Sequence, residues 1–443
     1  MAKSRREISF GLAVVLSLTA AALVRTGHGA DAAFARASGT RFTIGGRPFY
    51  SNGFNAYWLM YMASDPADRS KATAALDEAA RLGATLVRTW AFSDGGYRAL
   101  QVSPGVYDEE VFRGLDYVIS EAKKRGIHLI LSLVNNWDGY GGKKQYVQWA
   151  RTQGHSLNSD DDFFTDSVTK GFYKNHAVLT RVNKMTGVAY KDEPAIFAWE
   201  LMNEPRCQSD LSGKTLQAWI TEMASYVKSV DPNHTVEIGL EGFYGDRVHA
   251  RPQAPVQPGR VHRRHRLHLQ QPDPRRRLRH DPLLPRPMVS CCNDTQGARS
   301  NAWRRPRWER LPIDLVPRIT CVVHCRVPGA SDGAQVAFMR RWMASHAGDA
   351  AAVLRKPLLV AEFGWSARSN SYTVSMRDAY FRMVYEAIYA SARAGGPLAG
   401  GLFWQVMVPG MESWTDGYDV VLDRSPSTAA VVGQECSRMT GLN

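Results

Sequence analysis

Mainly apolar runs alternate with amphipathic stretches along most of the chain. The runs 127–134, 196–201 and 357–362 are typical of strands buried on both faces of a parallel sheet. The stretches 69–82 and 214–229 place apolar residues three and four positions apart, which predicts helices. Strand-like and helix-like segments that follow one another in this way predict parallel βα units.

The same pattern predicts the remaining elements. The polar stretch 139–164 is rich in Gly and Asp, and we expect it to be a long loop after the third strand. The fold class that follows is α/β, a (β/α)8 TIM barrel with a gap where the sixth strand belongs. After a hairpin at 41–50, we expect strands at 50–55, 84–89, 235–239 and 400–404, and helices at 109–125, 166–186, 335–345 and 376–394.

The sixth-strand region is replaced by an irregular Arg- and Pro-rich segment, 247–329. It contains 18 arginines, no lysine and five acidic residues, so it carries a formal charge of +13, which equals that of the whole chain. It also holds 12 of the 22 prolines and has no apolar period. The basic character of the chain therefore belongs to this segment, and the rest of the chain is neutral.

Three interpretations of the segment stay open. It is a polybasic tract for nucleic acid or another anionic polymer, a disordered linker, or an aberrant stretch that was never selected as protein. Codons compatible with 280–288, read one base forward, give Thr-Ile-His-Ser-Tyr-Pro-Asp-Gln-Trp. Codons for Val289 and for Cys325-Arg326 can supply the two ends of an intron. We favour a frameshift over about 247–288 followed by a retained intron over about 289–326.

The first thirty residues are typical of a secretory signal. Lys3, Arg5 and Arg6 precede an apolar run at 10–24, and small residues around 28–30 offer a cleavage site. We therefore expect a signal peptide at 1–30 and a mature protein that is secreted to the extracellular space or the cell wall. Once the signal is removed, we expect no attachment to a membrane.

The mature chain is expected to be one domain, 31–443, interrupted by 247–329. Its length and its 44% hydrophobic residues suit a single large barrel. Cys207 and Cys436 are the cysteines outside the irregular segment. They can pair in an oxidising compartment, but the sequence leaves open whether they meet.

Two carboxylates stand at predicted strand ends, where barrel enzymes hold their catalytic groups. Glu204 lies in WELMNEP and Glu362 in LLVAEFG, each after a run that should be buried. A buried carboxylate must be paired or functional, so a purely structural ion pair is the alternative interpretation. Facing carboxyls can hydrolyse a glycoside with retention, because one protonates the leaving oxygen while the other attacks the anomeric carbon. Arg88 is placed to keep Glu362 ionised.

Four segments in order carry a family resemblance. They are VRTWAFSDGG (87–96), WELMNEPRC (199–207), KPLLVAEFGWS (356–366) and GGLFWQVM (400–407). Together they resemble glycoside hydrolase family 5, and its plant endo-β-1,4-mannanases in particular, over roughly 38–246 and 327–435. The resemblance implies that Glu204 is the acid/base and Glu362 the nucleophile, with substrate-binding positions at Arg88, Trp90, Asn203 and Trp404.

The resemblance also implies what the chain acts on. The expected reaction is endo-hydrolysis of β-1,4-linked mannan, galactomannan and glucomannan by a monomer, without a cofactor, a metal or nucleic acid. A catalytically dead relic and an endo-β-1,4-glucanase are the alternatives, the second because the same glutamates serve a glucan chain. Family members carry a His and a Tyr from the strand-six region, and the written chain has neither in register. We therefore expect low stability and low activity.

Overall fold

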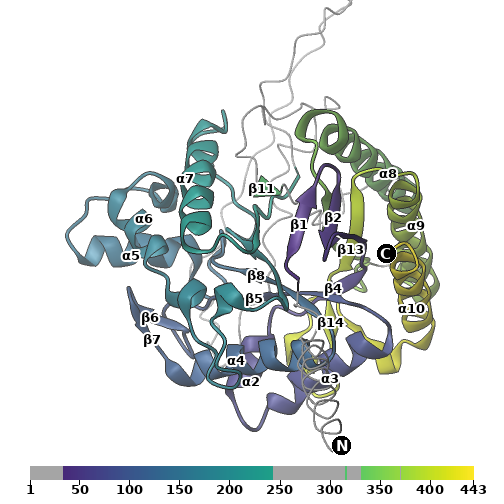
Figure 1. The fold of residues 1–443 in the computed structure, drawn as a ribbon, viewed down its shortest axis with the longest axis horizontal. Coiled ribbons are helices and arrows are strands. Elements are labelled where there is room, and N and C mark those ends of the chain that lie inside the picture. The colour runs from purple at the N-terminus through teal and green to yellow at the C-terminus, as the bar shows by residue number, and fades with distance from the viewer. Residues whose placement is uncertain (1–32, 243–314, 317–330, 370) are drawn as a thin grey trace, which may run out of the picture.

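The computed structural model describes residues 33–242, 315–316, 331–369 and 371–443 (Figure 1). An eight-stranded parallel sheet runs in the order β11-β10-β9-β8-β5-β4-β13-β12. From β4 to β11 each strand lies beside the next in sequence, β12 lies beside β13, and β13 returns beside β4, which is the strand order of a (β/α)8 barrel. The strands are β4 (Gly53–Asn55), β5 (Leu86–Trp90), β8 (His128–Ser132), β9 (Ile196–Glu200), β10 (Thr235–Glu237), β11 (Leu315–Val316), β12 (Leu358–Phe363) and β13 (Leu398–Phe403).

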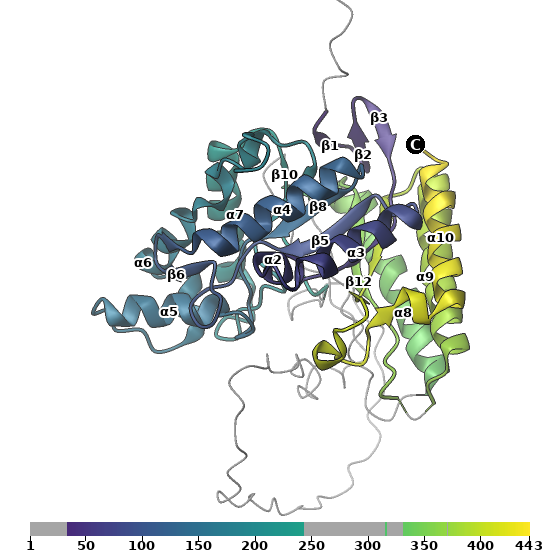
Figure 2. The ribbon, with the colours of Figure 1, turned by 90° about the horizontal axis from the view of Figure 1, so that it is seen from below.

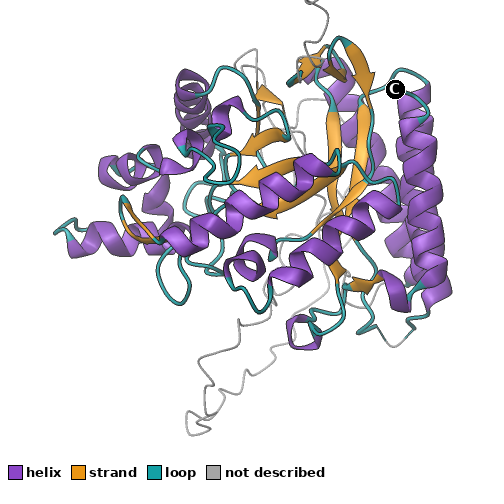
Figure 3. Ribbon diagram, turned by 60° about the horizontal axis from the view of Figure 1, so that its bottom comes forward, coloured by secondary structure: helices purple, strands orange, loops and turns teal. Residues whose placement is uncertain are grey.

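Helices cover the outside of this sheet (Figure 3). In Figure 2, α3 and α4 lie over β5 and β8, and α9 and α10 run side by side. The helices are α2 (Leu59–Ser64), α3 (Arg69–Arg81), α4 (Glu109–Lys124), α5 (Gly142–Thr152), α6 (Ser167–Lys174), α7 (Lys214–Val230), α8 (Asp332–Asp349), α9 (Val374–Arg393) and α10 (Pro426–Thr440).

Shorter elements complete the described chain. An antiparallel sheet of β1 (Ala35–Ser38), β2 (Arg41–Ile44) and β3 (Arg47–Phe49) precedes the barrel. The others are the pairs β6 (Gln101–Ser103) with β7 (Val106–Tyr107) and β14 (Val406–Met407) with β15 (Val420–Val421), the single helical turns η1 (Asp160–Phe164), η2 (Ala177–Thr180), η3 (Tyr190–Asp192), η6 (Glu412–Trp414) and η7 (Leu422–Arg424), and the π-helix η5 (Ala350–Leu354).

The predicted core strands are buried throughout. All residues of β5, β9, β12 and β13 are buried, as expected for strands with helices outside and barrel side chains inside. Gly53 allows β4 to approach β5, because a Cβ there would lie 1.7 Å from the carbonyl oxygen of Leu86. Helix starts follow local chemistry as well: the Asp108 side chain accepts hydrogen bonds from the backbone N–H groups of Glu110 and Val111 and so begins α4.

Two predictions about the segment after β8 are wrong. The stretch 139–164, expected to be a loop, contains α5 and η1. Positive φ angles at Gly141 and Gly142 turn the chain into α5, whose apolar face buries Tyr146 and Val147. The helix expected over 166–186 ends at Lys174.

The last part of the expected helix forms a turn instead. The side-chain oxygen of Asn183 accepts hydrogen bonds from the backbone N–H groups of Met185 and Thr186, which stabilises a turn instead of a helix. The sequence analysis also missed β1, α2, the β6–β7 pair and α10.

The sixth strand position is occupied. Most of 247–329 lies outside the described residues, as does the expected signal peptide at 1–30. Within that segment, however, Leu315–Val316 forms β11, parallel to β10, where no strand was expected. Among the described residues β11 and β12 do not pair, so the ring of strands is open between the sixth and seventh positions.

Cys207 and Cys436 are both buried and free, so they do not form a disulfide. No helix in the described parts of the chain has the length and apolar character needed to cross a bilayer.

Candidate active site

Both predicted carboxylates lie at the carboxyl end of the parallel sheet. Glu362 is part of β12, and Glu204 follows β9, with Asn203 directly before it. The two glutamates are buried, with only 5% of Glu204 and 3% of Glu362 exposed. Removing a charged carboxylate from water is costly without partners, so their surroundings decide what each can do.

Arg88 provides the main partner for these carboxylates. Its side chain, on β5, is 1% exposed and forms ion pairs with both Glu200 and Glu362. Nε lies 2.9 Å from Oε2 of Glu200, and Nη2 lies 2.5 Å from Oδ1 of Asn203. Burial opposes the charge on Arg88, but the adjacent carboxylates of Glu200 and Glu362 outweigh it and raise the pKa of Arg88. The expected contact between Arg88 and Glu362 is therefore present.

Asn55 connects this ion cluster to the strand backbones. Its side-chain oxygen accepts a hydrogen bond from Nη1 of Arg88 at 3.1 Å, and its amide donates to the carbonyl oxygen of Ala361 at 2.8 Å. Asn203 donates in the same way to Oδ1 of Asn135 at 3.0 Å. The cluster thus ties β4, β5, β9 and β12 together at the end of the sheet that carries the two glutamates.

Glu204 has a different environment from Glu362. Burial, followed by the negative charges of Glu241 and Glu362, raises the pKa of Glu204 well above its usual range. Its Oε2 accepts a hydrogen bond from Nε1 of Trp137 at 2.5 Å, and among the described residues its Oε1 has no hydrogen-bond partner. Its backbone has a φ of 53°, a strained value for a non-glycine residue that is often found at functional sites. Glu204 is thus suited to hold a proton and to donate it.

Replacing Trp137 by phenylalanine should raise the pKa of Glu204 further. The Trp137 N–H group stabilises the carboxylate form, so its loss favours the protonated form. We expect the basic limb of the pH profile of kcat/KM to move to higher pH, because that limb reports the acid of the free enzyme. Trp149→Phe, on α5, is the control and should leave the limb in place. If the basic limb of the Trp137→Phe variant moved to lower pH, the assignment of Glu204 as the acid stabilised by Trp137 would be contradicted.

Trp137 is itself held by an ion pair. The guanidinium of Arg206 lies 5.5 Å from the centre of the Trp137 ring and makes two hydrogen bonds to Glu241, at 2.8 and 2.7 Å. Lys143 donates to the backbone oxygen of Arg206 at 2.9 Å. These contacts fix the segment after Glu204.

Trp90 and Trp404 lie in an aromatic cluster beside the glutamates. The Trp404 backbone N–H donates to the carbonyl oxygen of Phe363 at 2.8 Å, so Trp404 is adjacent to Glu362. Its indole N–H donates to Asp416 at 2.6 Å, and its ring stacks on Tyr57 with centroids 5.5 Å apart. Trp90 contacts the same Tyr57 ring at 4.6 Å. The structure therefore brings all six predicted site residues to one end of the barrel.

The sequence analysis did not predict several residues of the site. The sequence analysis gave no role to Glu200 or Asn55. Glu200 is fully buried. It accepts two hydrogen bonds from Arg88 and a third from Ser132 at 2.8 Å. A signal was available, since Asn55 and Glu200 are both polar residues at the ends of apolar strands.

Asp94, in the VRTWAFSDGG segment, is buried, and none of the described residues places a cation beside its carboxyl group. Burial raises the pKa of Asp94 from 3.8 to about 8, against the opposing hydrogen bonds from Gln101 and Tyr146. The folded protein therefore keeps the proton that the unfolded chain loses above about pH 4. This difference destabilises the fold increasingly as the pH rises from about 4 to about 8.

Asp94→Asn should stabilise the protein, and more so at pH 8 than at pH 5. Asparagine keeps the shape and the acceptor oxygen but cannot ionise, so the pH-dependent penalty disappears. Urea unfolding at the two pH values measures the difference. Asp138→Asn, at an exposed carboxylate, is the control and should not change the slope. An equal gain at both pH values would show that Asp94 is ionised in the folded state.

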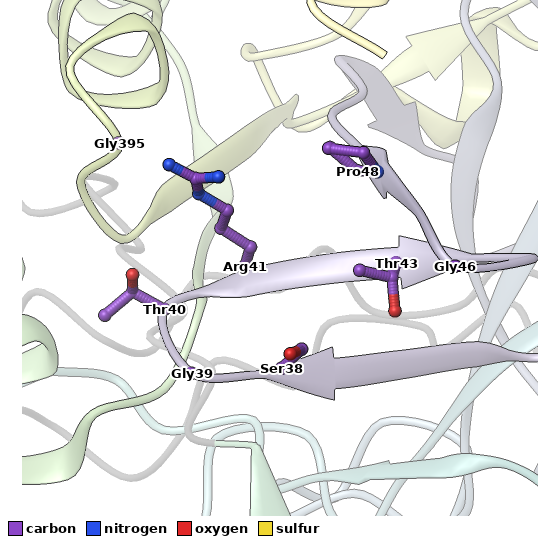
Figure 4. Close-up of a pocket in the computed structure, with 8 residues that line it drawn as sticks. All are labelled: Ser38, Gly39, Thr40, Arg41, Thr43, Gly46, Pro48 and Gly395. Carbon is purple, nitrogen blue, oxygen red and sulfur yellow. The ribbon is translucent and has the colours of Figure 1, made fainter.

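A pocket of about 460 Å³ lies at the other end of the barrel (Figure 4). It is lined by the β1–β2 turn, including Gly39 and Thr40, and by Gly395, which precedes β13. Arg41 extends from β2 toward Gly395. No carboxylate lines this pocket, so it is not the site of acid/base chemistry. No group of three or more His, Cys, Asp or Glu side chains in the described ranges could hold a metal ion.

A pair of buried carboxylates with contrasting surroundings, at the carboxyl end of a parallel barrel sheet, defines a glycoside hydrolase site. Comparisons with known proteins agree. A family model described as GH family 5 beta-mannosidase-like matches residues 32–255. A protein of Oryza sativa subsp. japonica, named provisionally as mannan endo-1,4-beta-mannosidase 9, is 65% identical over 97% of this chain and 96% of its own length.

Two further comparisons agree with this match. Mannan endo-1,4-beta-mannosidase 1 of the same plant is 50% identical over 94% of this chain and 88% of its own length. The solved endo-1,4-beta-mannanase from Rhizomucor miehei superimposes with a TM-score of 0.66 at 25% identity, over 92% of this chain and 99% of that one. The chain therefore belongs to glycoside hydrolase family 5, in its β-mannosidase-like group.

Proposed function

We propose that the chain is a retaining endo-β-1,4-mannanase, with Glu204 as the acid/base and Glu362 as the nucleophile. The observation that carries the proposal is the contrast between the two carboxylates. Glu362 is paired with a buried arginine, which favours its ionised form, whereas burial and nearby negative charge favour the protonated form of Glu204. The relatives named above support mannan as the substrate.

The reaction follows from these two states. A carboxylate oxygen of Glu362 attacks the anomeric carbon and forms an ester bond to it. The bond from that carbon to the leaving oxygen breaks, and the oxygen takes the proton of Glu204. Water then attacks the same carbon from the opposite side, gives a proton to Glu204, and releases Glu362 as a carboxylate. Two displacements retain the configuration at the anomeric carbon.

The electrostatics also support the change of role at Glu204. The negative charge of Glu362 is one cause of the raised pKa of Glu204. When Glu362 becomes an ester it loses that charge, so the pKa of Glu204 falls and Glu204 can act as a base. The remaining roles that we propose are a hydrogen bond from Asn203 to the sugar 2-hydroxyl and a ring face of Trp404 or Trp90 beneath the sugar.

Hydrolysis of galactomannan and of cellulose, measured side by side, tests the substrate. We expect reducing ends to appear from galactomannan in excess, with internal cleavage seen as a rapid fall in viscosity. The first product from a manno-oligosaccharide should carry the β configuration by proton NMR. Faster release from cellulose would favour the endoglucanase alternative, and an α product would exclude the retaining mechanism.

The segment 247–329 leads us to propose that this chain has low activity. The open edge between β11 and β12 supports this, because an unpaired strand edge weakens a closed barrel. A version in which the segment is replaced by its in-frame reading should hydrolyse galactomannan faster and unfold at higher urea concentration. Equal turnover by the two versions would refute the proposal.

The basic start and apolar run of the first thirty residues support secretion to the cell wall or extracellular space. Expression in a plant or yeast secretory host, with mass analysis of the N-terminus, tests this. A mature chain that begins near Asp31 in the medium is the expected result, and a retained full-length chain is the contrary one.

A further inference from the structure

A second group of aromatic side chains lies outside the buried cluster at Trp404. Tyr61 belongs to α2, directly after β4, and Tyr97 follows β5. Trp414 follows β13. Because β5, β4 and β13 are neighbours in the sheet, the three aromatic residues stand on connections from the same rim of the barrel that holds the glutamates.

Ring contacts connect Tyr61 and Trp414 to the site, and Tyr97 joins Tyr61 through the guanidinium of Arg98. The Trp404 ring stacks on Tyr57, and Tyr57 lies 6.1 Å from Tyr140 and 6.5 Å from Trp414. Tyr61 in turn lies 5.9 Å from Tyr140 and 5.4 Å from Trp414. The row therefore runs outward from the proposed reacting centre.

Exposure increases along this row. Trp404 is 3% exposed, Tyr57 and Tyr61 are half-buried, and Tyr97 is 61% exposed. An exposed large aromatic residue at the outer end of a row that begins at an active site is suited to contact a polymer, because a ring face packs on the apolar face of a sugar.

Arg98 holds the outer end of the row in place. Its guanidinium lies 5.2 Å from the centre of the Tyr61 ring and 5.4 Å from that of Tyr97, and it forms an ion pair with Asp65. The φ of Arg98 is 51°, a strained value for a non-glycine residue that persists only where the surroundings enforce it. A cation between two tyrosine rings restricts both of them, which lowers the entropy lost when a ligand binds.

We propose that Tyr61, Arg98 and Tyr97 form a distal platform that binds sugar units of a mannan chain several positions away from the bond that is cleaved. The proposal rests on the proposed function, since it assigns the polymer a path across the rim. Long substrates reach the platform, and short ones do not. The platform therefore contributes to affinity for long chains and leaves the chemistry at Glu204 and Glu362 unchanged.

Calorimetric titration of the full chain carrying Glu204→Gln, which prevents turnover, tests this. We expect Tyr97→Ala to weaken the binding of mannohexaose by about tenfold and to leave mannobiose unaffected. Tyr97→Trp should restore the affinity for mannohexaose. Met185→Ala is the matched control, because Met185 is 56% exposed and precedes its strand, β9, whereas the residues of the site and of the platform follow their strands, so it should change neither affinity.

The outcomes separate this proposal from the proposed function. Unchanged mannohexaose affinity in Tyr97→Ala, or an equal loss for mannobiose, overturns the platform. If cellohexaose binds with the same dependence on Tyr97 and mannohexaose does not bind, the platform stands and the assignment of mannan is wrong.

Discussion

Glu362→Gln should abolish the formation of a covalent glycosyl-enzyme. A fluorinated mannosyl donor with a good leaving group forms the ester quickly and hydrolyses slowly, so the parent chain should gain the mass of one sugar on the peptide that contains Glu362. The amide of glutamine is not a nucleophile, and loss of an active-site nucleophile costs on the order of 10⁴- to 10⁶-fold in rate. We expect no labelled peptide from the variant.

The labelling experiment suits a chain of low activity, because it requires a single turnover. Glu362→Gln removes one of the two carboxylates that contact Arg88 but leaves Glu200 in place, so the variant should remain folded. Near-ultraviolet circular dichroism checks this. Labelling of another carboxylate in the parent, or undiminished labelling in the variant, would mean that Glu362 is not the nucleophile.

Arg88→Met should destabilise the protein by about 3–5 kcal/mol, because removal of one partner leaves buried charge uncompensated. Arg88 is 1% exposed and serves Glu200 and Glu362 at once. Methionine fills part of the space but offers no positive charge. Urea unfolding followed by tryptophan fluorescence measures the change. The chain is expected to unfold at a much lower urea concentration, with a similar dependence on urea.

Arg113→Met provides the control for this prediction. Arg113 pairs with Glu110 on α4, but both side chains are largely exposed, and exposed ion pairs contribute little to stability. A small effect of Arg88→Met, close to that of Arg113→Met, would show that Glu200 and Glu362 are not both ionised in the folded protein. Arg88→Lys should recover only part of the stability, since a single ammonium cannot reproduce the several directed hydrogen bonds of the guanidinium.

Much of the barrel followed from the sequence. Mainly apolar runs such as 127–134 and 357–362 have few alternatives to a buried strand, and Glu204 and Glu362 were conspicuous because each follows such a run. The contact between Arg88 and Glu362 could be expected from their positions at strand ends. The pattern is informative here because burial penalises any polar residue that lacks a partner.

Other features depended on contacts that a linear pattern does not carry. Whether 139–164 forms a helix depends on glycines with positive φ and on a core for the apolar face of α5. The turn at 183–186, where a helix was expected, depends on one asparagine side chain that bonds to the backbone. The role of Trp137 depends on Arg206 and Glu241, which are distant in sequence from it and become neighbours only in the fold.

The open edge of the sheet has a consequence for stereochemistry. Within the described residues, β12 pairs only with β13, so the strand that carries Glu362 has a partner on one flank alone. Contacts from neighbouring strands therefore help to hold this end of β12, because Arg88 on β5 pairs with Glu362 and the Asn55 amide on β4 donates to the carbonyl oxygen of Ala361. A glycosidase that inverts needs a wider gap between its acids than one that retains. A change that let this end of β12 shift at the open edge is therefore expected to alter the gap between the two acids, and with it the stereochemical outcome.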